Sequence, residues 1–219
     1  MSVLLSVNLA VPRPGPGGLT GIDKRPVEGP VPVRAPGPRG SGLTGLAGDR
    51  VFALDAHGGD DQAVYAYARE DLDAWQAELG RELPAGAFGE NFTTSGVDVT
   101  GALVGERWRV GADLVLEVSR PRIPCQTFAH RMGEDGWVRR FTEWAAPGAY
   151  LRVVDPGDVR AGDRITVLSR PEHDVTIGVT FRALTLEPEL LPRLLDLAAL
   201  PVALRERAAR RVASSSVEI

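Results

Sequence analysis

The chain has 219 residues, of which 43% are hydrophobic and 25% charged, a composition typical of a soluble globular protein with a proper core. Its net charge of −4 argues against a nucleic-acid-binding surface, because phosphate binding needs a strong cationic excess. The single cysteine, Cys125, cannot form an internal disulfide, so nothing marks an oxidising compartment.

The opening MSVLLSVNLAV is apolar but has neither the basic region nor the cleavage site of a signal peptide. It is also too short to span a bilayer. Alternation of Val3, Leu5 and Val7 predicts a first β-strand instead. We therefore expect a cytoplasmic protein with no membrane association.

Proline and glycine dominate the rest of the first fifty residues. Prolines at 26, 30 and 32 cannot donate to a β-ladder, so any strand there should be short, bulged or at a sheet edge. The run 34–42 is predicted to be a loop from its composition.

Residues 51–170 alternate strand and turn patterns and include two predicted helices. Leu72 and Trp75 mark the apolar side of the first helix, and Trp137 and Phe141 that of the second. In chain order we expect a strand at 63–67, a helix at 69–79, a loop at 88–96, a hairpin within 106–121, a helix at 136–144, and strands at 149–154 and 163–169. Many short strands with two inserted helices predict a mainly β fold, a closed or nearly closed β-barrel.

The end of the chain differs in composition and is predicted to be a small three-helix extension, residues 173–219, after a β-domain of residues 1–172. Pro188 and Pro201 stand where first-turn prolines are tolerated. The three patterns, rich in Leu, Ala and Arg, cover 176–184, 188–200 and 202–212. The closing ASSSVEI is expected to fray.

Cys125 lies in the stretch SRPRIPCQTF, just beyond a predicted strand. Pro121 and Pro124 fix the backbone and would hold a thiol in one place. Arg120 and Arg122 bring positive charge, which favours the reactive thiolate. On these residues alone two interpretations stay open: Cys125 does chemistry in a cleft, or it is a small core residue beside solvated arginines.

A glycine loop elsewhere offers polar groups for a ligand. His57 stands directly before Gly58 and Gly59, whose N–H groups could cradle an anion. The His57 side chain could donate to that anion or move a proton. The alternative is a plain turn with an exposed histidine.

The loop FGENF is a second, weaker candidate. Gly89 allows a close backbone approach, and Glu90 and Asn91 supply hydrogen-bonding groups. Alone, this loop indicates no particular ligand.

Together these pieces resemble the MOSC domain family, the molybdenum cofactor sulfurase C-terminal domains, from about Lys24 onward. The pieces that carry the resemblance are LAGDR (46–50), HGGDDQAVYAY (57–67), GENFTTSGV (89–97), SRPRIPC (119–125) and GAYLRVVDPGDVRAGD (148–163). Their order and spacing look most like the bacterial YiiM-like branch, the 6-hydroxylaminopurine-resistance proteins, and the tail resembles that branch's C-terminal extension.

The resemblance implies a β-barrel that binds the molybdenum cofactor, a molybdenum atom on a molybdopterin dithiolene with a phosphate tail. It implies an oxidoreductase that removes oxygen from N-hydroxylated compounds such as hydroxylaminopurines. Electrons would come from a separate flavin or haem protein. The tail would shape the substrate entrance, contact the redox partner or mediate assembly into a homodimer.

The resemblance also implies roles for the candidate residues. Cys125 matches the family's thiolate ligand to the metal, and soft thiolate suits a metal already held by sulfur. His57 would donate a proton to the leaving oxygen. Arg50, Arg120 and Arg122 are candidates for the cofactor phosphate. The remaining cofactor candidates are Gly58, Gly59, Gly89, Glu90 and Asn91.

Some features depart from the family's pattern or leave alternatives open. The Pro/Gly-rich stretch 30–42 is longer than the family usually needs, and Gln126 follows the cysteine where an aromatic or basic residue is common. Lys24 is a further phosphate candidate, for which we favour an ordinary surface position. Two other functions stay open: a carrier of the cofactor, or of sulfur on Cys125, and a non-catalytic barrel with an inert cysteine.

Overall fold

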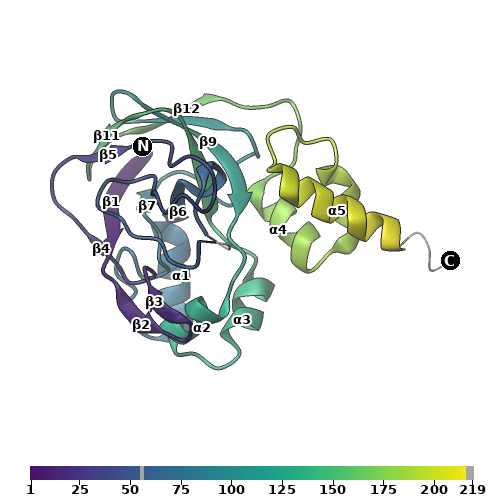
Figure 1. Cartoon of the computed structure of the whole chain (residues 1–219), viewed down its shortest axis with the longest axis horizontal. Coiled ribbons are helices and arrows are strands. Elements are labelled where there is room, and N and C mark those ends of the chain that lie inside the picture. The colour runs from purple at the N-terminus through teal and green to yellow at the C-terminus, as the bar shows by residue number, and fades with distance from the viewer. Residues whose placement is uncertain (55–56, 216–219) are drawn as a thin grey trace.

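The computed structural model describes residues 1–54 and 57–215 and is built around an eight-stranded mixed sheet (Figure 1). The strand order is β12-β8-β9-β10-β6-β7-β1-β4, with β6 and β7 parallel. Two small ribbons, β11–β5 and β2–β3, lie outside it. The strands are β1 (Val3–Ala10), β2 (Arg13–Gly15), β3 (Gly18–Thr20), β4 (Lys24–Pro26), β5 (Val31–Val33), β6 (Val64–Ala68), β7 (Phe92–Ser95), β8 (Arg107–Val110), β9 (Leu114–Pro121), β10 (Ala149–Asp155), β11 (Gly157–Val159) and β12 (Ile165–Ser169).

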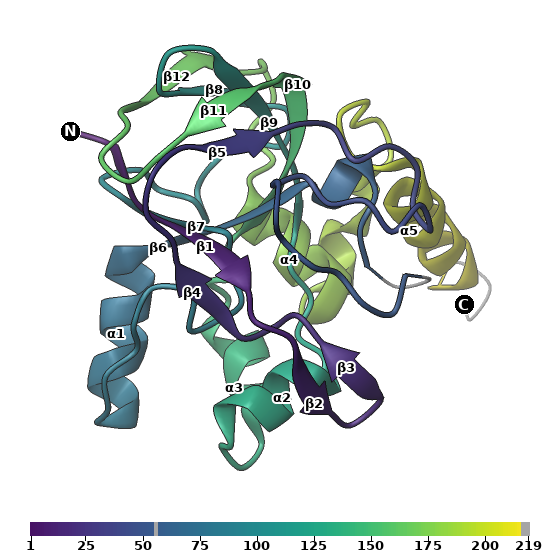
Figure 2. The same cartoon turned by 60° about the vertical axis from the view of Figure 1, so that its left-hand side comes forward.

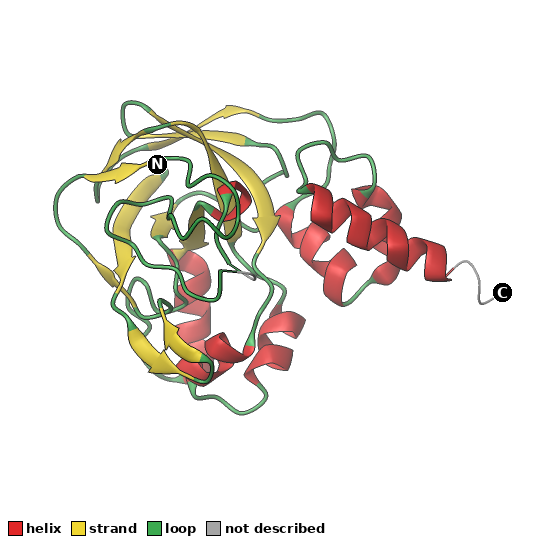
Figure 3. Cartoon of the chain, viewed as in Figure 1, coloured by secondary structure: helices red, strands yellow, loops and turns green. Residues whose placement is uncertain are grey.

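The longer helices form two groups, one below the sheet and one at its side (Figure 3). The first group comprises α1 (Arg69–Leu79), α2 (Gln126–Met132) and α3 (Trp137–Trp144). The second comprises α4 (Ile177–Thr185), the 3₁₀ helix η2 (Pro188–Leu194) and α5 (Val202–Ser215), and a short 3₁₀ turn, η1 (Asp60–Gln62), precedes β6. No helix in the described part of the chain is long and apolar enough to cross a membrane.

The sheet does not form the closed barrel that we expected from the sequence. Its strand order runs from β12 at one edge to β4 at the other, and no ladder among the described residues joins these two strands. The sheet still curls, because Leu4 N donates to Asp163 O over 2.8 Å and Ile165 N donates to Ser2 O over 3.0 Å. Pro26 in β4 has no N–H with which to extend a ladder.

The strongest local patterns predicted their elements correctly. The strand and helix expected at 63–67 and 69–79 are β6 and α1, and the expected hairpin is β8–β9, turned at Gly111 with φ +66°. The helix expected at 136–144 is α3. The proline-containing strands β4 and β5 are short, and β4 lies at the sheet edge, as the prolines indicated.

Other elements differ from the sequence prediction because strands that are distant in the sequence pair with one another. In β1 it is Leu4 and Val7 that are buried, while Leu5 is 42% exposed, because a β-bulge between Leu4 and Ser6 shifts the alternation. The expected loop 88–96 contains β7, which lies inside the sheet between β6 and β1.

The region between β9 and β12 also differs from the prediction. The helix α2 directly after Cys125 was not predicted, since seven residues are too few for a clear apolar period. The expected strands at 149–154 and 163–169 are β10 and β12, but they do not pair with each other. β10 pairs with β9 and β6, β12 pairs with β8, and β11 lies in the connection between them.

Two apolar clusters fill the interior. The larger one lies along the sheet and includes Leu116, Val118 and Leu151. The second, here called the aromatic cluster, joins the sheet to α1, α2 and α3; its buried rings are Tyr65, Tyr67, Trp75, Phe88, Phe128, Trp137 and Phe141. Cys125 packs against the aromatic cluster.

The C-terminal segment has helical elements at the three expected places, α4, η2 and α5, but the middle one is shorter than expected. Its middle part is the 3₁₀ helix η2, which ends at Leu194 and contains Pro192, a residue that cannot donate a helical hydrogen bond. Leu184, Leu194, Leu197 and Leu204 are buried in the same cluster as the sheet residues, and Leu190 is partly buried against it. Helix α4 contacts β9 (Figure 1). Of the end expected to fray, 213–215 belong to α5, and 216–219 lie outside the described residues.

Candidate functional site

Most of the predicted site residues line one pocket. Its empty space, counted out to the solvent at its mouth, is about 1130 Å³. The walls come from within residues 15–24, 43–65, 89–91 and 122–127, with Tyr150 from β10. The β2–β3 hairpin, which supplies part of the first wall, lies beside α2 (Figures 1 and 2). The predicted residues that line the pocket are Cys125, His57, Arg50, Gly58, Gly89, Asn91 and Arg122.

Cys125 lies between the end of β9 and the start of α2. It is a free thiol, half-buried, with an extended backbone at φ −133°. Its carbonyl accepts a hydrogen bond from Ala129 N over 3.0 Å, and it packs against the aromatic cluster. The cysteine is therefore held by the fold at the pocket wall rather than placed on a free loop.

Arg122 is a buried cation beside this cysteine. The residue is 6% exposed, and its Nη1 donates to Phe88 O over 2.7 Å. Its guanidinium carbon lies 3.6 Å from the ring centre of Phe128 and 5.3 Å from that of Tyr65. No carboxylate in the described part of the chain pairs with it. Because buried charges in proteins are normally paired, this guanidinium favours an anionic ligand in the pocket.

A second buried cation, Lys24, is paired within the protein. Its Nζ lies 2.6 Å from Asp49 Oδ2, and the two side chains are 9% and 8% exposed, so Lys24 is not the surface lysine that we favoured. Burial lowers the pKa of Lys24, against the opposing charge of Asp49. Asn91 Nδ2 donates to Asp49 Oδ2 over 2.8 Å, and its Oδ1 accepts from Tyr65 N over 3.2 Å. These bonds join β4, β6 and the pocket floor.

The charged groups of the wall give the pocket a positive balance. Among the described residues, Lys24, Arg50 and Arg122 line it, and Asp49 is the one carboxylate there. On a chain with a net charge of −4, this is a local concentration of positive charge. Such a balance suits a ligand that carries a phosphate.

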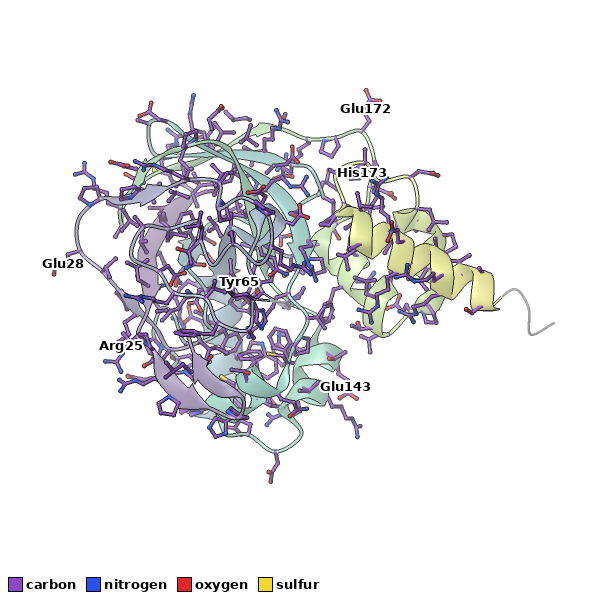
Figure 4. All side chains as sticks on the ribbon, in the orientation of Figure 1. Arg25, Glu28, Tyr65, Glu143, Glu172 and His173 are labelled. Atoms are coloured by element: carbon purple, nitrogen blue, oxygen red, sulfur yellow. The ribbon has the colours of Figure 1, made fainter. Side chains whose placement is uncertain are left out.

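Two phenols complete the wall near the cysteine. Tyr65, labelled near the centre of Figure 4, packs against Tyr150 with the ring centres 5.0 Å apart and the rings tilted by 36°. The hydroxyl of Tyr65 donates to Pro147 O over 2.9 Å. Burial raises the pKa of both phenols, so they stay neutral and contribute polar, uncharged surface.

Glycine allows the N-terminal segment to pass close to the other walls. Gly89 has φ +79°, and a Cβ there would lie 2.9 Å from Ile22 Cγ1. A Cβ on Gly21 would collide with the carbonyl oxygen of Arg50. The close approach predicted for Gly89 therefore serves the packing of the chain on itself at the pocket edge.

Three predicted residues do not line the pocket: Gly59, Glu90 and Arg120. Glu90 is fully buried and accepts hydrogen bonds from Phe88 N over 3.0 Å and from Thr93 Oγ1 over 2.8 Å. Burial raises its pKa, and its bonds hold the turn before β7 rather than a ligand. Gly59 precedes η1, and Arg120 lies in β9 on another side of the wall.

His57 lines the pocket next to residues 55–56, which are not described. Its backbone N donates to Ala53 O over 3.0 Å. Asp49, Tyr65 and Tyr150 also line the wall and were not among the predicted site residues. Asp49 stood inside the LAGDR motif, so a signal for it was present. The two tyrosines had no signal, since each looks like an ordinary strand residue.

No group of three or more His, Cys, Asp or Glu side chains that could hold a metal ion occurs within residues 1–54 and 57–215. Cys125 is the one predicted metal ligand, and it lines the pocket. A thiolate is a suitable donor for a metal that a cofactor brings with its own sulfur ligands.

Comparisons with family models and with known proteins point to the same family. The family model described as MOSC domain matches residues 53–166. The chain is 33% identical to YflK of Bacillus subtilis over 178 residues, which is 80% of this chain and 76% of YflK. It is 33% identical over 138 residues to a protein of Gibberella moniliformis named reductase, covering 62% of this chain but only 24% of that protein.

The fold also has a solved counterpart. The crystal structure of YiiM from Geobacillus stearothermophilus superimposes with a TM-score of 0.78 at 26% sequence identity. The match covers 96% of this chain and 99% of that one. The similarity therefore includes the C-terminal helices as well as the sheet.

Proposed function

Because the chain belongs to the MOSC domain family, we propose that it is a reductase that holds a molybdenum cofactor in this pocket and removes oxygen from N-hydroxylated compounds. The observation that carries the proposal is the guanidinium of Arg122, buried without a carboxylate partner among the described residues, on the wall that it shares with Cys125. The reductase-named fungal relative supports the reaction class, although the chain spans only 24% of its length.

The wall residues fit this group by their chemistry. Cys125 would supply one soft ligand to the metal. Arg122 and Arg50 would bind the phosphate tail, since guanidinium groups make two parallel hydrogen bonds to such oxygens. Gly58, at φ +86°, lines the same wall, but its N–H donates to Gln62 Oε1 over 3.1 Å, so it shapes the wall rather than offering a free donor. Asn91 and Glu90 form their hydrogen bonds with other protein groups, so they hold the pocket wall in place rather than contact a ligand.

The net reaction is the two-electron reduction R–NHOH + 2e⁻ + 2H⁺ → R–NH₂ + H₂O, in which the N–O bond breaks and the oxygen leaves as water. When bound, the cofactor supplies the two-electron redox centre that accepts this oxygen. His57 would deliver a proton to the leaving oxygen, because imidazole is a common proton donor in such steps. The electrons would come from a separate flavin or haem protein.

The experiment replaces Cys125 with Ser in protein made in a host that synthesises the cofactor. Serine is nearly the same size but is a hard, mostly protonated donor, so Cys125→Ser should fold normally and lose most of its molybdenum. Molybdenum content and turnover of an N-hydroxylated compound with a chemically reduced dye are measured on the same sample. Gln126→Ala, at the exposed neighbouring residue, is the matched control and should change neither.

The outcomes separate the possible functions. Bound molybdenum without turnover in the wild type would indicate a carrier of the cofactor. Wild-type molybdenum content in Cys125→Ser, with unchanged turnover, would show that Cys125 is an inert core residue and would refute the proposal.

A further inference from the structure

Three arginines come from segments that are distant in the sequence and that converge where β9 contacts the C-terminal helices. Arg39 belongs to the loop after β5, Arg120 to the end of β9 and Arg207 to α5. The Arg39 loop packs on the turn that precedes η1, since a Cβ on Gly59 would lie 2.9 Å from Arg39 N. The 3₁₀ turn η1 in turn contacts β9, which brings the loop to the strand that carries Arg120.

The helical segment reaches the same place. Arg152 in β10 donates through Nη2 to Ala199 O over 3.0 Å, and the same atom donates to Ser119 Oγ over 3.2 Å. Ser119 is the neighbour of Arg120, and Ala199 lies shortly before α5. The end of β9 and the chain that leads into α5 are therefore joined at this point.

These three arginines have no counter-charge of their own. Within the described residues, none of Arg39, Arg120 and Arg207 forms an ion pair, and Arg120 Nε is buried without a hydrogen-bond partner. Arg152 nearby shows the opposite situation. It lies 2.6 Å from Asp61 and 3.0 Å from Glu117, which are thereby already engaged.

The electrostatics agree with this geometry. Burial lowers the pKa of Arg120, and the positive charges of Arg39 and Arg207 lower it further, against the effects of Tyr150 and Asp61. Gathering like charges around a partly buried guanidinium is unfavourable unless an anion joins them. The unfilled donor of Arg120 and the two exposed guanidinium groups supply what a phosphate monoester needs.

We propose that Arg39, Arg120 and Arg207 form a second anion site, which binds the phosphate group of a phosphorylated small-molecule substrate. Tyr150 links it to the pocket, because Tyr150 is the register partner of Arg120 across β9–β10 and also lines the pocket wall. The inference rests on the proposed function and narrows it, since the N-hydroxylated substrate would carry a phosphate. It also assigns Arg120 to binding the substrate's phosphate, whereas the sequence had suggested the phosphate of the cofactor.

Binding to the cofactor-free protein tests this without any turnover. The probes are inorganic phosphate and the matched pair adenosine 5′-monophosphate and adenosine, which differ only in the phosphate, measured by calorimetry at low ionic strength. The double variant Arg39→Gln/Arg207→Gln removes two exposed side chains and should fold. It should bind adenosine 5′-monophosphate at least about tenfold more weakly than the wild type. Arg210→Gln, on the same helix, is the control and should bind like the wild type.

One further variant identifies which site holds the phosphate. Arg50→Gln alters the cofactor pocket, which can itself hold a phosphate, and should weaken only the binding at that pocket; the preference for adenosine 5′-monophosphate over adenosine should persist, because Arg39, Arg120 and Arg207 are unchanged. Loss of phosphate binding in Arg50→Gln, with full binding in Arg39→Gln/Arg207→Gln, would assign the anion to the cofactor's own phosphate position and overturn the inference. So would a wild type that binds neither probe, or one that binds adenosine as tightly as its monophosphate. None of these results bears on molybdenum content, so the proposed function is judged separately.

Discussion

The buried pair Lys24–Asp49 offers a sharp test of how the pocket is held together. We consider Lys24→Met, Asp49→Asn and the double variant, all at pH 7. In Lys24→Met the carboxylate of Asp49 keeps only the donors Ala10 N, at 2.8 Å, and Asn91 Nδ2, at 2.8 Å. In Asp49→Asn the ammonium of Lys24 loses its only ion-pair partner among the described residues.

Each single substitution should therefore lower the free energy of unfolding by about 3–5 kcal/mol, the usual cost of leaving one buried charge uncompensated. The double variant removes both charges. Its loss should be smaller than the sum of the two single losses, with a coupling free energy of about 2 kcal/mol. The coupling is favourable because the two charges are opposite, and it is large because, at exposures of 9% and 8%, bulk water screens them only weakly.

Urea unfolding of the four proteins gives the cycle, with an unchanged slope as the condition for comparing them. The exposed pair Arg139–Glu143, 2.8 Å apart on α3, is the matched control and should show no measurable coupling. Strictly additive losses at Lys24 and Asp49 would show that the two charges act independently. In that case the pocket floor is not held by this ion pair.

Two further predictions concern stability. Burial, together with neighbouring carboxylates, raises the pKa of Asp71 from 3.8 to about 6, so the folded state binds the proton more tightly and its stability falls as the pH rises from about 4 to 6. Asp71→Asn should thus be about 3 kcal/mol more stable than the wild type at pH 7.5 and nearly equal to it below pH 4, as measured by urea unfolding. Asp73→Asn, at an exposed position of the same helix, is the control. A stability difference that does not vary with pH would contradict the raised pKa of Asp71. Gly89→Ala should lower the melting temperature by several degrees more than Gly29→Ala. Both glycines have φ near +80°, but only at position 89 would a new Cβ lie 2.9 Å from Ile22 Cγ1. Equal shifts in melting temperature would show that the Ile22 side chain moves aside at no cost.

Much of this protein follows from its sequence alone. Patterns within ten or so residues predicted β6, α1, the β8–β9 hairpin and α3, because apolar period and turn glycines act locally. The position of Cys125 and Arg122 just beyond the end of β9 was also predicted correctly, because prolines cannot donate to a β-ladder and so end the strand. The motifs that indicated the family were short, ordered segments of the same kind.

Other features were decided by contacts between distant segments. The stretch Phe92–Ser95 looks like a loop until it pairs with β6 and β1, and the bulge in β1 appears only when that strand meets β7. Arg120 and Arg122 are two residues apart in the chain, yet Arg122 lines the pocket and Arg120 does not. Lys24 is buried because Asp49, 25 residues later, is brought against it. Burial and charge pairing depend on which segments meet in space, and a local pattern carries no information about a partner that lies far along the chain.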